Sequence, residues 1–263
     1  MNEYRNRTAL VTGASKGLGT ALARDLASRG SHLVLVARSA SRLEHLADEL
    51  RAQYGVQVNP ISADLGSDEG VQTVLAATAA LPAIDLLVNN AGLGGVGSFV
   101  DRPLDEAIAP IAVNVIGLVR LTHAVAGRMA NDGRGGIINI GSTGAFQPMP
   151  FQNVYSSTKA FVLMFTEALA EELRARGVRV MIASPGPTAT EFFADSEVDP
   201  AVRSLDSADT VARDILDDFA AGRTASYPGR RSNRPQTWAA RILPRTAVTR
   251  ITGDLARKNG FDV

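Results

Sequence analysis

Residues 8–19 read TALVTGASKGLG, and this stretch is the most informative signal of the fold. Its first four residues have the composition of a buried strand, and Gly13, Gly17 and Gly19 follow just before an amphipathic stretch. Glycine lets the main chain turn tightly and approach a ligand, and the N-terminus of a helix favours an anion. A glycine turn alone also occurs as a plain linker, but its position between the first strand and first helix predicts a dinucleotide phosphate site.

Apolar runs and amphipathic stretches alternate outward from this turn, as is typical of βαβ units. We predict strands at residues 8–11, 33–37, 56–61, 86–89, 137–140 and 178–183. We predict helices at residues 17–29, 41–54, 67–80, 104–129, 154–176 and 207–222. Ser41 and Glu44 have the spacing of a capping box, and Ser207 has the position of a helix cap. The predicted fold is a single-domain α/β doubly wound parallel sheet (Rossmann) in three layers, with ligands at the carboxyl ends of the strands.

Composition excludes several classes of protein. The chain has 263 residues, 45% of them hydrophobic, and no cysteine, which excludes disorder, disulfide scaffolds and thiolate or Cys-ligated metal chemistry. Basic and acidic residues number 27 each, which argues against a nucleic-acid partner. His32, His45 and His123 lack ligand spacing, so we predict no metal. We find neither a signal peptide nor an 18-residue uncharged apolar window, so we expect no transmembrane segment and a cytoplasmic location.

Charge changes abruptly near the C-terminus. Residues 191–218 hold nine acidic residues and two arginines, whereas residues 223–258 hold nine basic residues and one aspartate. We predict a Rossmann-fold catalytic domain at residues 1–230 and a basic C-terminal extension at residues 231–263 packed on the same domain. The main interpretation is that acidic and basic segments pack together. The alternative is weak membrane-surface contact or partner binding by residues 238–258.

Further motifs follow the glycine turn, whose own spacing is T-G-x-x-x-G-x-G. They are Asp64-Leu65, Asn89-Asn90-Ala91-Gly92, Asn114, Ser142, Tyr155-x-x-x-Lys159 and Pro185-Gly186-Pro187-Thr188. With these motifs, in this order, the sequence resembles the short-chain dehydrogenase/reductase family over about residues 8–225. Residues 227–230 and 238–258 resemble a branch of that family with a basic C-terminal extension.

The end of the second predicted strand indicates which nucleotide is bound. A carboxylate there would bond the adenosine ribose 2′-hydroxyl, but the position is held by Arg38. A guanidinium forms a bidentate contact with a 2′-phosphate, and Lys16 and Arg42 add positive charge. We therefore predict NADP(H) in preference to NAD(H), with a solvated Arg38 as the alternative interpretation.

The family resemblance implies the remaining cofactor contacts. Asp64 and Leu65 would flank the adenine, residues 90–92 would pass beneath the nucleotide, and the loop after Pro185 would line the nicotinamide. Thr188 replaces the branched apolar residue that the family usually has. The full predicted cofactor set is Gly13, Ser15, Lys16, Gly17, Leu18, Gly19, Arg38, Asp64, Leu65, Asn90, Ala91, Gly92, Tyr155, Lys159, Pro185, Gly186, Thr188 and Thr190.

Tyr155 and Lys159 are four residues apart on a predicted helix, so they share one face. A tyrosine titrates near 10, and an ammonium about 5 Å away contributes on the order of 3 kcal/mol at an effective dielectric near 20. We therefore predict that Lys159 lowers the pKa of Tyr155 and that the positive charge of an oxidised nicotinamide supplies the remainder of the shift. The resemblance implies that Tyr155 is the general acid/base and that Lys159 also bonds the nicotinamide ribose. It further implies that Ser142 holds the substrate oxygen and that Asn114 completes a proton relay.

The expected reaction is hydride transfer between NADP(H) and a hydrophobic ketone, aldehyde or secondary alcohol. Apolar side chains after Ser142 and after Thr190 would enclose the substrate; they are Phe146, Met149, Pro150, Phe151, Phe192 and Phe193. By analogy with the family, the helices at 104–129 and 154–176 would form a homodimer or homotetramer. The main alternative is a catalytically silent NADP-binding regulator. A sugar-nucleotide epimerase is disfavoured by chain length and glycine spacing, and a peripheral-membrane protein would depend on the basic tail alone.

Overall fold

The structure is a computed structural model that describes residues 3–189 and 205–262. Seven parallel strands form one sheet in the order β3-β2-β1-β4-β5-β6-β9. The strands are β1 Thr8–Thr12, β2 His32–Ala37, β3 Val58–Ser62, β4 Leu86–Asn89, β5 Gly135–Ile140, β6 Val178–Ala183 and β9 Ala225–Ser226. The chain reverses its direction across the sheet between β3 and β4, so the carboxyl ends of β1 and β4 border the crevice that a doubly wound sheet offers to a ligand.

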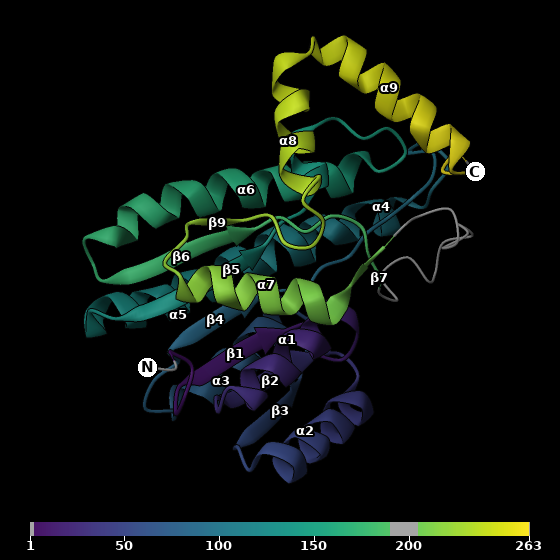
Figure 1. Ribbon diagram of the computed structural model, residues 1–263. Coiled ribbons are helices and arrows are strands. Elements are labelled where there is room, and N and C mark those ends of the chain that lie inside the picture. The colour runs from purple at the N-terminus through teal and green to yellow at the C-terminus, as the bar shows by residue number, and fades with distance from the viewer. Residues whose placement is uncertain (1–2, 190–204, 263) are drawn as a thin grey trace.

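Helices cover both faces of the sheet, which gives the predicted three layers (Figure 1). One face packs against α1 Gly17–Ser28, α2 Ala40–Tyr54 and α7 Ala208–Ala220. The other packs against α3 Asp68–Ala79, α5 Leu118–Asp132 and α6 Asn153–Arg174. Strands such as β1 and β4 are buried along nearly their whole length, because both of their faces are covered. The predicted fold class is confirmed.

The helix predicted at 104–129 is not one regular helix. It consists of α4 Leu104–Ile111, a π-helical segment η1 Ala112–Gly117, and α5. A π-helix is wider than an α-helix and is frequent at functional sites. Here it holds Asn114, which is 1% exposed.

This run is also the only one among the described residues that is long and apolar enough to cross a membrane. That test rests on length and composition, which core helices also pass, and 39% of the run's most apolar window is buried. Leu121, Val125 and Met129 belong to the buried core beneath the sheet, so we assign the run to the body of the protein.

Two predicted helix caps differ from the structure. Helix α2 begins at Ala40 with Ser39 as its N-cap, so the predicted capping box of Ser41 and Glu44 is wrong. Ser207 is the N-cap of α7, but its side chain makes no capping hydrogen bond. A third serine, Ser67, does cap its helix, because its hydroxyl accepts a hydrogen bond from the Gly70 N–H at 3.0 Å.

Two helices follow the sheet, α8 Asn233–Ile242 and α9 Arg245–Lys258. Figure 1 shows them standing out from the body beyond the end of α6. Val248, Ala256 and Phe261 are buried, and the Thr252 hydroxyl donates to the Pro148 carbonyl at 2.9 Å. The segment therefore rests on the loop that precedes α6. A short pairing of β7 Thr188–Ala189 with β8 Asp206–Ser207 lies near its base.

Candidate active site

The glycine turn has the geometry that a phosphate cradle requires. Gly13 and Gly17 have φ angles of +66° and +58°, a region that side-chain-bearing residues rarely adopt. A Cβ at Gly19 would lie 2.1 Å from the Gly13 carbonyl oxygen, so glycine is needed there for close packing. Within the described chain, α1 begins at this turn without a side-chain cap or an acidic residue in its first turn. The helix end is therefore suited to an anion.

Thr12 and Asn90 fix this turn against the neighbouring strand. The Thr12 hydroxyl accepts hydrogen bonds from the backbone N–H groups of Asn90 and Ala91, each at 2.9 Å. In return, the Asn90 amide donates to the carbonyls of Thr12 and Gly13 at 2.9 and 3.2 Å. The turns after β1 and β4 therefore act as one unit. Thr12 lies outside the predicted cofactor set, although its place directly before Gly13 was a signal for it.

The side chains predicted to select the nucleotide lie around this unit. Arg38 is exposed at the end of β2, and Lys16 is exposed in the glycine turn. The two segments are adjacent, because the Ala14 N–H donates to the Val36 carbonyl at 3.2 Å. Asp64 follows β3, and its carboxylate accepts from the Gly66 N–H at 2.9 Å, while Leu65 is buried.

Lys159, Asn114 and Gly92 come together beneath the crevice. Lys159 is 5% exposed, and its Nζ donates to the Ile140 carbonyl at 2.8 Å. A Cβ at Gly92 would lie 3.3 Å from Asn114 Oδ1 and 3.6 Å from Lys159 Nζ. The sequence motifs that hold these residues are far apart along the chain, and the fold places them at one point.

Asn114 is held by three hydrogen bonds. Its Oδ1 accepts from the Leu93 N–H at 2.8 Å, and its Nδ2 donates to the Leu93 carbonyl and to the Thr158 hydroxyl, both at 2.9 Å. Thr158 was missed from the sequence, and its only signal was its place beside Lys159. The π-helical segment and α6 are thereby joined through one side-chain pair.

Ser142 and Tyr155 meet at the carboxyl end of β5. Ser142 is the N-cap of the short helix η2 Thr143–Phe146, and its hydroxyl accepts from the Gly144 N–H at 3.0 Å. The Tyr155 hydroxyl forms a side-chain hydrogen bond with Ser142. Lys159 Nζ lies 5.9 Å from the centroid of the Tyr155 ring.

The charge states of this pair differ from the prediction. Burial raises the pKa of Tyr155 above its usual value, and the bond to Ser142 lowers it only in part. Burial also lowers the pKa of Lys159 to about 8. The predicted lowering of the Tyr155 pKa by Lys159 is therefore wrong for the protein without its cofactor, because burial of the phenol is the dominant effect on that pKa.

The structure describes only some of the predicted site residues in the loop after β6. The Pro185 carbonyl accepts from the Thr143 N–H at 3.0 Å, which joins the loop after β6 to the loop after β5. The Thr188 hydroxyl donates to the Gly186 carbonyl at 3.0 Å. Thr190, Phe192 and Phe193 lie outside the described residues.

The predicted substrate loop is shaped by contacts with other parts of the chain. Phe146 packs against the Tyr227 ring, with 6.1 Å between ring centroids, and so belongs to the packing under the loop. Phe151 has a φ of +64°, and its carbonyl accepts from the Gly97 N–H at 3.0 Å. A non-glycine residue in this region of φ costs on the order of 1 kcal/mol or more and is typical of functional loops.

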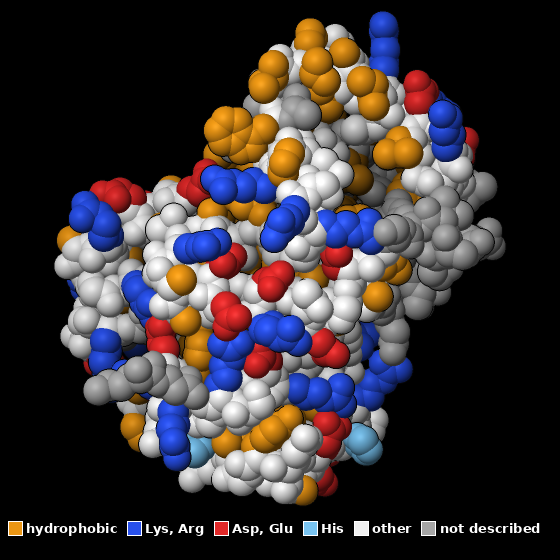
Figure 2. Space-filling view, viewed as in Figure 1, with side chains coloured by type: hydrophobic (Ala, Val, Ile, Leu, Met, Phe, Trp, Pro, Cys, Tyr) orange, Lys and Arg blue, Asp and Glu red, His pale blue; other side chains and the backbone are white. Residues whose placement is uncertain are grey.

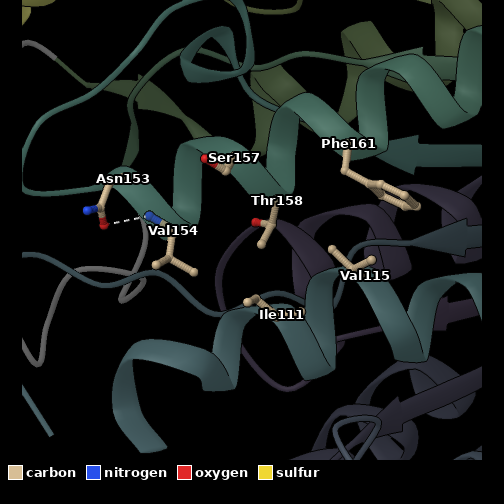
Figure 3. Close-up of a pocket in the computed structure, with 7 residues that line it drawn as sticks. All are labelled: Ile111, Val115, Asn153, Val154, Ser157, Thr158 and Phe161. Carbon is tan, nitrogen blue, oxygen red and sulfur yellow. Dashed lines mark hydrogen bonds between the residues drawn. The ribbon is translucent and has the colours of Figure 1, made fainter. Parts of the chain in front are cut away.

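A groove of about 400 Å³ lies outside this crevice, between α4, η1 and α6. Figure 3 shows Ile111 and Val115 on one side and Val154, Thr158 and Phe161 on the other. The groove lies along the outer face of α4, η1 and α6, and one of its lining residues, Thr158, accepts a hydrogen bond from Asn114 of the site.

Comparison with known proteins places this geometry in a family. Residues 7–200 match the model of the short chain dehydrogenase family. The chain is 35% identical over 198 residues to the NADP-dependent 3-hydroxy acid dehydrogenase of Schizosaccharomyces pombe, covering 73% of this chain and 75% of that one. It spans only 60% of the length of the very-long-chain 3-oxoacyl-CoA reductases of Anas platyrhynchos and Bos taurus.

Solved structures agree with this assignment. A short-chain dehydrogenase from Sphingobium yanoikuyae in complex with NADPH has a TM-score of 0.81 at 35% identity, covering 84% of this chain and 87% of that one. A bulky-bulky ketone specific alcohol dehydrogenase from Comamonas testosteroni has a TM-score of 0.78 at 30% identity, with 91% and 95% covered. Other similar structures contain either NADPH or NAD. Sequence and structure together show that the chain belongs to the short-chain dehydrogenase family.

Proposed function

We propose that the protein is an NADP(H)-dependent oxidoreductase that transfers a hydride between the nicotinamide and a hydrophobic ketone, aldehyde or secondary alcohol. One observation carries this proposal. Three separate segments supply the four side chains, which are joined through one chain of contacts beside the glycine turn: Asn114 from η1, Ser142 from the loop after β5, and Tyr155 and Lys159 from α6. Both a nucleotide cradle and a proton donor are therefore available at one edge of the sheet.

The residues present fit a dinucleotide. Gly13 and Gly19 leave backbone surface bare where any Cβ would collide, and the uncapped start of α1 suits the pyrophosphate. Arg38 and Lys16 would hold the 2′-phosphate, and no carboxylate stands at the end of β2 to repel it. When bound, the cofactor supplies the hydride.

Tyr155 is the proposed general acid in reduction and general base in oxidation. Its raised pKa keeps the phenol protonated at neutral pH, which is the form that donates to a carbonyl oxygen. Ser142 contacts the Tyr155 hydroxyl and would also hold the substrate oxygen. Lys159 and Asn114 are fixed by backbone and side-chain partners and would anchor the nicotinamide ribose and relay the proton.

The proposed substrate is apolar. Met149, Pro150 and Phe151 lie in the loop between η2 and α6, and their side chains carry no charge. The similar alcohol dehydrogenase from Comamonas testosteroni is described as specific for bulky ketones, which supports the same class here.

The proposal also includes an oligomeric state and a cellular location. Ile108, Ile111, Ile116, Phe161 and Met164 are exposed on the outer face of the two long helices. We propose that a second copy covers this face and the groove of Figure 3, in a homodimer or homotetramer. The proposed location is cytoplasmic.

A panel assay tests the function. NADPH depletion is followed with ketones, aldehydes and quinones of increasing apolar size, with NADH in parallel and Tyr155→Phe as the inactive control. Turnover of apolar carbonyls with NADPH supports the proposal. NADPH binding without turnover of any carbonyl would favour the silent regulator, which we consider weaker because all four side chains of the catalytic set are present.

A further inference from the structure

The two C-terminal helices expose five large apolar side chains. We define the C-terminal apolar patch as Trp238, Ile242 and Leu243 of α8 and the turn after it, with Ile251 and Leu255 of α9. They are 56%, 79%, 46%, 58% and 57% exposed, respectively. Figure 2 shows apolar side chains gathered over α8 and α9, at the top of the molecule. A cluster of this kind marks an interaction surface, whereas single exposed apolar residues are ordinary.

Among the described residues, several cations of the C-terminal segment form no ion pair, whereas most of those in the body do. In the described chain, most arginines of the body form ion pairs, among them Arg7, Arg24, Arg29, Arg51, Arg120 and Arg179. By contrast, no ion pair within the described residues involves Arg231, Arg234, Arg245, Arg250 or Lys258. Arg257 is paired, with Asp254 at 3.0 Å.

We propose that α8 and α9 dock this protein on the surface of an anionic lipid bilayer. The apolar patch would enter the boundary between headgroups and acyl chains, and the unpaired cations would face the lipid phosphates. Trp238 is the residue type that favours this boundary, because its ring is apolar and its N–H is polar. A second copy of the chain would bring the same cations against one another, so the charge favours an anionic partner.

The two helices that carry the patch contact the loops beside the candidate active site. Thr252 bonds the Pro148 carbonyl, and the Arg257 guanidinium lies 5.6 Å from the Phe151 ring centroid. At the start of α8, Asn233 packs against Gly186, in the loop after β6 that is expected to line the nicotinamide. Docking would hold the loop between Ser142 and α6 near the bilayer, where an apolar carbonyl compound is concentrated. That last consequence, unlike the docking itself, rests on the proposed function.

The single tryptophan makes the experiment direct. The full-length protein is titrated with vesicles of phosphatidylcholine alone and of phosphatidylcholine with phosphatidylglycerol, while Trp238 emission and co-sedimentation are recorded. We expect a blue shift and co-sedimentation with the anionic vesicles only, weakening as salt is raised. Lipids with a quencher on the upper acyl chain should quench Trp238.

Matched variants separate the two contributions. Arg245→Gln with Arg250→Gln should weaken binding about 25-fold, since each cation near an anionic surface contributes about fivefold. Ile242→Ser with Ile251→Ser should weaken it by more than about tenfold. The controls are Arg213→Gln, a cation on α7 for which the described part of the chain offers no ion pair, and Val100→Ser, 84% exposed on the body; both should bind as the parent does.

Three results would overturn the proposal. They are the absence of a Trp238 shift with every vesicle, equal binding to neutral and anionic vesicles, and self-association abolished by Ile242→Ser without vesicle binding. Turnover of a water-soluble ketone is measured on the same samples without vesicles. Failure of docking leaves that turnover intact, and failure of the proposed enzymatic function leaves vesicle binding intact.

Discussion

The body of the molecule and its C-terminal helices treat the same residue types differently. In the body, most arginines of the described chain form ion pairs with carboxylates, and large apolar side chains such as Leu10 and Leu87 are fully buried. In α8 and α9, no ion pair among the described residues involves Arg234, Arg245 or Arg250, and Trp238 and Ile242 are exposed. Most charged and apolar side chains of the body therefore have partners within the chain, apart from the crevice and the outer face of α4, η1 and α6. In the terminal helices, the corresponding charged and apolar side chains are available to a partner outside the chain. Substitutions in each region test this difference.

Removal of the phenolic proton in the body should have the largest effect. Tyr155→Phe should lower kcat for carbonyl reduction about 1,000-fold, within the usual range for a general acid, with little change in thermal stability. Steady-state kinetics with NADPH would measure it. Tyr54→Phe, at the end of α2, is the matched control and should keep parental kcat; Tyr155→Phe with near-normal kcat would contradict the assignment.

The glycine turn offers the next largest effect. Gly19→Ala should weaken NADPH binding by at least about 100-fold, because its Cβ would lie 2.1 Å from the Gly13 carbonyl oxygen and the turn must shift. Fluorescence titration would measure affinity. Gly127→Ala on α5 has nothing within 4 Å of the new Cβ, so it should leave binding unchanged and stabilise the protein by up to about 1 kcal/mol. Parental NADPH affinity in Gly19→Ala would show that the cradle lies elsewhere.

A substitution of Arg38 tests whether this exposed cation binds the 2′-phosphate or is only solvated. Arg38→Asp should lower the ratio of NADPH to NADH affinity by about 10- to 100-fold, through loss of a charge-assisted contact and repulsion of the 2′-phosphate. Dissociation constants for both cofactors would measure the ratio. Arg213→Asp on α7 should leave it unchanged. An unchanged ratio in Arg38→Asp would mean that Arg38 is solvated.

The buried lysine predicts a pH dependence. Burial lowers the pKa of Lys159 to about 8, so its ammonium is present below pH 8 and is lost above it. The kcat/KM for reduction should therefore be level near pH 7 and fall about tenfold per unit above pH 8. Tyr155 does not cause this fall, because its pKa is raised and the phenol stays protonated there. A profile that remains level to pH 9.5 would contradict the prediction.

The smallest effect is expected on the terminal helices. Ile242→Ser should change the free energy of unfolding by less than about 0.5 kcal/mol and leave vesicle-free turnover within twofold, because the side chain is 79% exposed. Its counterpart in the body, Leu87→Ala, removes a fully buried side chain and should cost about 2–5 kcal/mol. Chemical denaturation would compare them. A large loss of stability in Ile242→Ser would show that the patch is packed.

Much of the fold was predictable because the signals for it are local. Buried parallel strands are continuous apolar runs, and the six predicted strands overlap β1 to β6. The seventh strand, β9, has two residues and exists only through its pairing with β6, so it left no periodic signal. Helices α8 and α9 were not predicted as helices, because charge rather than periodicity dominated that segment.

The site was less completely predictable, because some of its contacts depend on tertiary packing. Motif spacing indicated the residues around the crevice but not three of the contacts that hold them. These are the bond from Asn114 to Thr158, the bond from the Asn90 N–H to the Thr12 hydroxyl, and the bond from Lys159 to the Ile140 carbonyl. The direction of the Tyr155 pKa was also mistaken, because a sequence does not show how far a pair is removed from water.

The π-helical turn at Ala112–Gly117 limits the insertions and deletions that this part of the chain can tolerate. A wider turn takes more residues than an α-helical turn over the same rise. Shortening this stretch by one residue would let α4 run into α5 as one regular helix and would rotate Asn114 away from Leu93 and Thr158. In comparing homologues, a one-residue gap here would therefore matter more than many side-chain replacements.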